Sequence, residues 1–118
     1  MAQLQVELER FRVIKGKEAV AQEWMTFLND HLEEVLQTLP GEKMYVESIF
    51  EEVVDETMYL YWVSYQGMAA SDVVFSDSHV DQKHLAYWSE CIDPNYGEHL
   101  LKTKVVMIQD KVKNEMQD

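Results

Sequence analysis

The sequence of 118 residues contains a single cysteine, Cys91, and only ten basic residues against 22 acidic ones, for a formal net charge of −12 at pH 7. A lone cysteine cannot form an internal disulfide, which fits a reducing cytoplasm. The negative charge argues against nucleic acid and anionic membranes as partners, because both attract Lys and Arg. No apolar run approaches the roughly 18 residues of a membrane span, and the first residues lack the pattern of a secretory signal.

Several motifs that carry chemistry are also missing. There is no glycine-rich phosphate loop, no CxxC pair and no Ser-His-Asp arrangement. His79 and His84 are five residues apart, whereas two histidines on one helix face that bind a metal are about four residues apart. We therefore expect neither a metal nor a cofactor.

What the sequence does contain is a hydrophobic core and a regular order of elements. Apolar residues make up 47% of the chain, and no linker or repeat divides it, so we expect one domain over residues 1–118. The hydrophobic periodicity predicts strands at about 6–14, 43–54, 57–66 and 103–109, and helices at about 18–39 and 78–92. A long loop is expected at 67–77 and a helical turn in the charged tail, 110–118. The order βαββαβ predicts an α+β, ferredoxin-like fold with a four-stranded antiparallel sheet and both helices on one face.

Local signals refine three of these elements. Pro40-Gly41 should stop the first helix. The apolar phase of the first strand changes between Leu8 and Phe11, which predicts a β-bulge at Glu9-Arg10. Asp55-Glu56 occupies the place of a hairpin turn. A two-residue turn would put Glu47 on the face of Met58, Leu60 and Trp62, and a one-residue slip would put it beside the tyrosines instead; the sequence leaves both registers open.

The two middle strands are apolar on both faces, and 58–63 has no polar residue in either phase. Two helices can cover only one face of the sheet. A large bare aromatic patch is unusual on a soluble monomer. We therefore expect a homodimer that packs sheet against sheet.

Arg10-Phe-Arg-Val-Ile-Lys-Gly-Lys17 followed by an amphipathic helix resembles the opening of the dimeric α/β-barrel superfamily, which includes antibiotic-biosynthesis-type monooxygenases, muconolactone isomerases and EthD- and NIPSNAP-like proteins. Nearly the whole chain is similar to a small bacterial family of unknown function within it. The matching stretches are 7–11, 23–29, 42–50, 59–62 and 83–93. The resemblance implies a homodimer with a cleft between sheet and helices, and it allows cofactor-independent oxygenation or isomerisation.

Candidate residues for such a cleft each have a structural alternative. Glu47 is unusual on an apolar strand and would need a cation such as Arg10 or Arg12, unless it forms a purely structural salt bridge. His79 or His84 could serve as an acid or base near neutral pH, although His84 shares a helix face with Trp88 and Cys91 and could be an edge residue of the core. We expect His79 to be the more exposed of the two.

The sequence thus predicts a cleft with His79, His84 and Glu47 as catalytic candidates. Its ligand-binding candidates are Arg10, Arg12, Tyr65 and Trp88. The function expected is the binding or transformation of a small organic molecule. The alternatives are a non-catalytic or stress-associated binding protein, and a structural homodimer whose cleft is filled by its own side chains.

Overall fold

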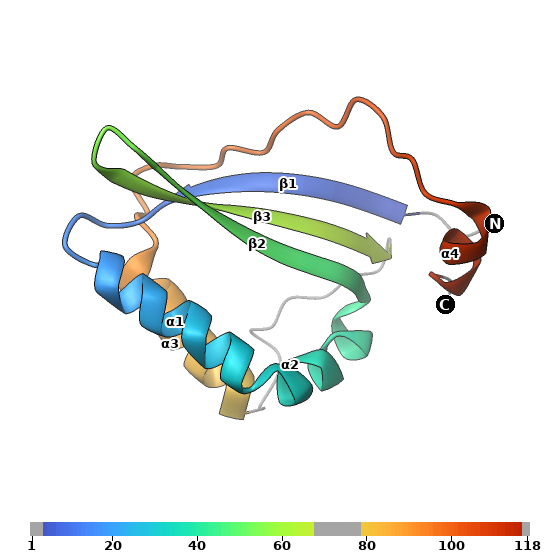
Figure 1. Cartoon of the computed structure of the whole chain (residues 1–118), viewed down its shortest axis with the longest axis horizontal. Helices are drawn as coiled ribbons and strands as arrows, with labels where there is room; N and C mark the ends of the chain where they lie inside the picture. Colours follow the sequence, from blue (N-terminus) through green and yellow to red (C-terminus); the bar gives the residue numbers. More distant parts are fainter. Residues whose placement is uncertain (1–3, 68–78, 117–118) are drawn as a thin grey trace.

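The computed structural model describes residues 4–67 and 79–116, and it confirms an α+β fold. A three-stranded antiparallel sheet has the order β1-β3-β2, and α1, α2 and α3 lie on one side of it (Figure 1). The elements are β1 (Leu4–Arg12), α1 (Glu18–Asp30), α2 (Leu32–Thr38), a 3-10 turn (Pro40–Glu42), β2 (Met44–Val54), β3 (Thr57–Gly67), α3 (His79–Cys91) and α4 (Asp110–Glu115). No helix in the described ranges is long and apolar enough to cross a membrane.

The hairpin between β2 and β3 decides which side chains face the helices. Val54 pairs with Thr57, and the two residues between them, Asp55 and Glu56, have φ values of 50° and 65°. Positive φ at both central positions belongs to a two-residue turn that matches the twist of the strands. This is the first of the two registers left open above, and it places Glu47 on the helix-facing side of the sheet.

The expected β-bulge in the first strand is wrong. β1 pairs with β3 without interruption, from Leu4 opposite Gly67 to Arg12 opposite Tyr59. Leu8 and Phe11 therefore point to opposite faces. No repair of the apolar phase is needed, because Phe11 packs against Trp62 and Trp88 on the helix side while Leu8 contributes to the other face. The register shift in the sheet lies in β2 instead, between residues 44 and 46.

The predicted helix 18–39 is two helices. His31 separates α1 from α2 with φ −113° and ψ 26°, outside the helical region. Its ring lies 4.3 Å from the Phe27 ring, and its Nδ1 is 3.0 Å from the Phe27 carbonyl oxygen. The His31 N–H still donates to the Phe27 carbonyl at 3.0 Å, as in a regular helix, so the break lies in the backbone dihedrals of His31. The apolar stripe is consequently buried in α1 and largely exposed in α2.

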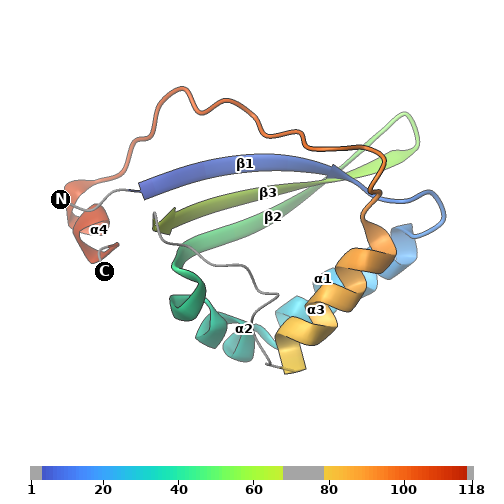
Figure 2. The ribbon, with the colours of Figure 1, turned by 180° about the vertical axis from the view of Figure 1, so that it is seen from behind.

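Residues 103–109, expected as the fourth strand, are not a strand in the structure. The preceding residues do lie along the free edge of β1, where the Arg10 N–H donates to the His99 carbonyl at 3.0 Å and the Leu101 N–H donates to the Leu8 carbonyl at 2.9 Å. Figure 2 shows this segment running past β1 toward α4. Glu9 forms an isolated bridge with Leu100, and the Thr103 hydroxyl donates to the Val6 carbonyl at 2.8 Å, so the segment follows β1 through separate contacts and not through a regular ladder. The helical turn expected in the tail is confirmed as α4.

The hydrophobic core lies between α1, α3 and the sheet. Its fully buried large side chains are Trp24 from α1, Leu60 from β3, and Val80 and Cys91 from α3. The Trp24 ring is 5.7 Å from the ring of Trp62 and 5.9 Å from that of Trp88. Aromatic pairs at such separations add to the stability that burial alone gives.

We expect the substitution Leu60→Ala to lower the free energy of unfolding by about 2–5 kcal/mol, because the side chain is only 1% exposed and its removal leaves a cavity. Leu36 in α2 is 53% exposed and provides the matched control, for which the same truncation should change stability by less than about 1 kcal/mol. Urea denaturation of the two variants measures both values. Equal losses would contradict the packing described here.

Candidate functional site

A cavity with two adjoining lobes lies between the helices and the helix-facing side of the sheet. The first, here called the α2 lobe, has a volume of about 280 Å³ and is bounded by α1, α2, the 3-10 turn, β2, β3 and α3. The second, the β1 lobe, measures about 420 Å³ and reaches Glu7, Glu9 and Phe11 of β1. Glu47, Trp62 and His84 line both lobes. These three side chains are therefore the boundary at which the lobes meet.

The local structure explains why polar side chains gather here. Glu47 lies opposite Ser64, and Ile49, two residues further along β2, lies opposite Trp62. Because side chains alternate along a strand, all four point toward the helices. On α3, Asp81 and His84 are three residues apart and share a face. The 3-10 turn, which follows α2, adds Glu42.

Two carboxyl groups in the α2 lobe are buried without complete hydrogen bonding. Glu42 is 8% exposed and Asp81 is 4% exposed. Glu42 Oε1 and Asp81 Oδ2 have no hydrogen-bond partner among residues 4–67 and 79–116. Burial raises the pKa of Glu42 to about 7, and the negative charges of Asp81 and Glu47 contribute to the increase. Glu42 therefore changes its protonation state near neutral pH.

Glu47 is the third carboxyl group of the site. It remains accessible to solvent inside the cavity. Protein surrounds it on most sides, and this desolvation raises its pKa, while a hydrogen bond from the Trp62 indole opposes the increase. The cation that we expected beside Glu47 is not found, because no Lys or Arg in the described ranges lines either lobe.

His84 is held as a neutral imidazole. Its Nδ1 accepts a hydrogen bond of 3.0 Å from the Trp24 indole Nε1–H. An accepting Nδ1 leaves the ring proton on Nε2. Burial lowers the pKa of His84, with Asp81 opposing the decrease, so the neutral form prevails at pH 7.

The structure brings together only part of the predicted site. Glu47, His84 and Trp88 line the β1 lobe together. His79 is exposed, as predicted relative to His84, and it lines neither lobe. Of the expected loop, residues 68–77 lie outside the described residues.

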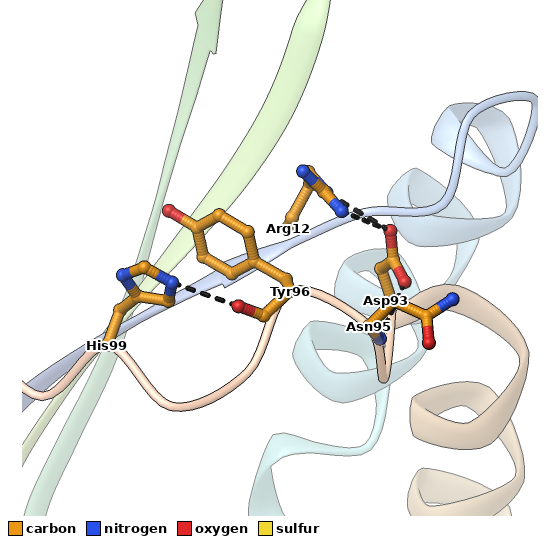
Figure 3. A network of polar contacts seen from close by, with 5 residues as sticks. All are labelled: Arg12, Asp93, Asn95, Tyr96 and His99. Atoms are coloured by element: carbon orange, nitrogen blue, oxygen red, sulfur yellow. Dashed lines mark hydrogen bonds and ion pairs between the residues drawn. The ribbon is translucent and has the colours of Figure 1, made fainter.

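The expectation that Arg10, Arg12 and Tyr65 line the cleft is wrong. In the register of β1 and β3, all three point to the face opposite the helices, here called the outer face. Arg12 donates to Asp93 Oδ2 from Nε at 3.1 Å and from Nη2 at 2.8 Å (Figure 3). Its guanidinium lies 4.8 Å from the centre of the Tyr96 ring. The regular ladder keeps Arg10 and Arg12 on the same face as Leu8, and Tyr65 lies opposite Val6 on that face.

Tyr96 organises the polar end of the outer face. Its ring stacks on His99 at 3.9 Å and also lies 5.7 Å from the Arg10 guanidinium. His99 Nε2 is 3.0 Å from the Tyr96 carbonyl oxygen. Arg10 additionally lies over the Tyr59 ring at 5.6 Å. Both arginines are thus engaged by groups outside the cavity.

Sequence reasoning missed Glu42 and Asp81 as site residues. Glu42 lies in a short turn that has no periodicity to reveal its direction, and Asp81 lies in the first turn of α3, where an acidic residue is common. An acidic residue at either place is too common to single out. In the described ranges, no group of three or more His, Cys, Asp or Glu side chains could hold a metal ion.

These observations define an α+β protein with an acidic cavity, walled by aromatic rings, between its sheet and helices. The chain belongs to DUF6176, a family of unknown function whose model matches residues 4–114. A search of curated proteins finds no match.

The raised pKa of Glu42 leads to a prediction about stability. In the unfolded chain this carboxyl ionises near its ordinary pKa of 4.5, and in the folded protein near 7, so the folded state holds the extra proton between these values. The contribution of Glu42 to stability must therefore fall as the pH rises from about 5 to about 8. We expect Glu42→Gln, which cannot ionise, to gain about 2 kcal/mol relative to the unmodified protein over this range, after allowance for screening by water in the cavity.

Urea denaturation of both proteins at pH 5 and pH 8 measures this gain. Glu33→Gln, which neutralises an exposed carboxyl on α2, is the control and should show no comparable change. A constant difference between Glu42→Gln and the unmodified protein at the two pH values would contradict the assignment.

Proposed function

We propose that the protein binds a small organic molecule in the cavity between its sheet and helices. The observation that carries this proposal is the pair of buried carboxyl oxygens, on Glu42 and Asp81, that face the α2 lobe without a partner among the described residues. A buried acceptor left unpaired is costly, and a ligand that donates hydrogen bonds removes the cost. An apolar cavity with a few convergent polar groups and perturbed pKa values is what a ligand site requires.

The groups around the cavity suit proton transfer without a cofactor. Glu42 is both protonated and ionised in appreciable amounts near pH 7, which is the best range for a general base. His84 presents a neutral ring with its Nε2–H free of the Trp24 bond, and can donate a hydrogen bond to an oxygen of the ligand. A carboxylate that takes a proton from one carbon and returns it to another completes an isomerisation. A monooxygenase-like reaction would begin with the same proton abstraction.

The cavity volume favours binding over a purely structural role. A homodimer whose cleft is filled by its own side chains would not leave lobes of about 280 and 420 Å³. A cytoplasmic location belongs to this proposal and is supported by the free, buried thiol of Cys91.

We also propose that the fold is the ferredoxin-like arrangement of the dimeric α/β barrels. Residues 99–103 lie along β1, so the order across the sheet is this segment, then β1, β3 and β2. That is the order of a βαββαβ sheet in which the last segment supplies the fourth strand. In this proposal, residues 103–109 complete the fourth strand when a second copy of the chain covers the sheet.

The outer face supports a homodimer. The helices α1, α2 and α3 lie on the other side of the sheet, so they leave this face uncovered. Phe50 is 59% exposed on the outer face of β2, with Val46 and Val54 also exposed beside it. Tyr61 lies opposite Phe50, and Val63 lies two residues along β3 from it. An apolar face of this extent is typical of an interaction surface, and a second copy would match it with the same residues.

Light scattering at micromolar concentration should give twice the mass of one chain. Phe50→Asp should shift the protein toward a monomer, because it places a charge in the proposed interface. The matched control is Val53→Asp on the same strand. Val53 is similarly exposed, at 58%, but points to the helix-facing side, so this variant should remain dimeric. A monomeric unmodified protein would refute the dimer.

A thermal-shift screen with a metabolite library tests the ligand proposal. A compound present at about 100 times its Kd should stabilise the protein by about 2.7 kcal/mol. We expect Glu47→Gln to weaken binding of any hit by at least about tenfold, or 1.4 kcal/mol. His79→Ala should leave binding unchanged, because His79 lines neither lobe. Unchanged binding in Glu47→Gln would place the ligand elsewhere.

A further inference from the structure

All the charged side chains that line the cavity in the described part of the chain are acidic. Glu42 and Asp81 face the α2 lobe, Glu7 and Glu9 face the β1 lobe, and Glu47 faces both. Within the described ranges, no Lys or Arg contributes to either lining. His84, the remaining ionisable group, is neutral because burial lowers its pKa. Both lobes therefore present a negative potential to whatever enters.

Two features distinguish the acidic lining of the cavity from an ordinary solvated acidic surface. Glu42 and Asp81 are each more than nine-tenths buried, and one oxygen of each has no partner among the described residues. The two groups are also close enough for the charge of Asp81 to oppose ionisation of Glu42. Like charges held together without a cation are unfavourable. A ligand that carries positive charge and N–H donors would satisfy both oxygens at once.

We propose that the ligand is an organic cation, a primary amine whose ammonium group lies between Glu42 and Asp81 and whose apolar body lies against Trp62. This inference rests on the proposed function, since it names the class of molecule that the cavity binds. An ammonium group has three N–H donors, which suits two carboxyl oxygens and a third acceptor. Glu47, which lines the same lobe, offers that third acceptor.

The walls favour an organic amine over an inorganic cation. No set of three His, Cys, Asp or Glu side chains in residues 4–67 and 79–116 is arranged to hold a metal ion. The α2 lobe is instead walled by Trp62, Met25, Leu28 and Ile49. An aromatic face attracts a cation and also packs against apolar atoms. A lobe of about 280 Å³ is near the lower end of ligand pockets, which suits a molecule with a single ring.

The proposal has a consequence for pH dependence. A cation beside Glu42 favours its ionised form, so binding releases a proton when Glu42 starts out protonated. The ionisable groups that face Glu42 across the lobe are Asp81 and His84 on α3 and Glu47 on β2. Among these, burial lowers the pKa of His84 and favours its neutral form, and the carboxyl groups only add negative charge. Affinity for an amine should therefore rise as the pH increases from 6 to 8.

The test uses the full chain and three probes of similar shape: 2-phenylethylamine, 2-phenylethanol and 3-phenylpropanoate. Titration calorimetry gives the Kd of each probe, and the Trp62 indole N–H signal in NMR spectra locates the bound ring. We expect the amine to bind at least about tenfold more tightly than the alcohol, and the carboxylate not to bind. Affinity for the amine should be higher at pH 8 than at pH 6.

Glu42→Gln and Asp81→Asn should each weaken amine binding by at least about tenfold. The control Glu33→Gln removes the same charge from an exposed position on α2 and should leave the Kd unchanged. Because Glu42→Gln relieves charge repulsion, it should fold at least as stably as the unmodified protein, and its melting temperature verifies this.

Equal amine binding by the two cavity variants and the Glu33→Gln control would show attraction to the acidic surface and would overturn the proposal. An alcohol or carboxylate that binds as tightly as the amine would also overturn it, while leaving a small-molecule site intact. The proposal would also be overturned if the amine does not bind and the library screen finds a compound of another class in the cavity. If no compound of any class binds, the proposed function fails together with this inference.

Discussion

The hydrogen bond from Trp24 to His84 joins the two long helices at the point where the core meets the cavity. Trp24 is fully buried on α1, and its indole N–H must find an acceptor there. The acceptor is His84 Nδ1 on α3, and the rings of Trp62 and Trp88 surround the pair. This bond sets the tautomer of His84 and, with the ring contacts of Trp24 and Phe27 to Tyr87, holds α3 against α1. The orientation of the cavity wall depends on both.

The alternation of side chains along the sheet then separates the charges. The arginines of β1, residues 10 and 12, point to the outer face, where Asp93 and the tyrosine rings engage them. Glu7 and Glu9, on the same strand, point to the helices, together with Glu47 of β2. Cations and carboxyl groups of adjacent positions thus lie on opposite sides of the sheet and cannot neutralise one another. The acidic cavity is a direct result of this register.

The sequence predicted most elements because their periodicity was strong. The hairpin turn at residues 55–56, α3 and the helical turn in the tail all agree with expectation. The break at His31 could not be predicted, since it lies in the backbone dihedrals of His31 and leaves no trace in the apolar pattern. The fourth strand failed for a different reason. Its apolar residues have the right spacing, but the last segment meets β1 through separate hydrogen bonds and one bridge and not through a regular ladder.

The candidate site was less predictable than the fold. Glu47 could be proposed because it is a charged residue on an otherwise apolar strand. His84 and Trp88 could be proposed because their spacing places them on one face of a helix. The position of the arginines depended on whether β1 contains a bulge, and a one-residue difference in a strand reverses every side chain beyond it. Glu42 and Asp81 depend on contacts between a short turn and a helix that are far apart in sequence. Such contacts are set by the packing of α2 against α3 and not by any local preference.

The unpaired carboxyl groups carry a cost in stability that the core has to offset. A glutamine at position 42 would fill the same space without a charge, and Asp81 could likewise be an asparagine. Sequences that break a local rule without a structural compensation tend to do so at functional sites. The aromatic cluster of Trp24, Trp62 and Trp88 packs beside the cavity and stabilises its wall. A stable core beside a destabilising cavity is the arrangement expected when the cavity is completed by a molecule that the chain itself does not provide.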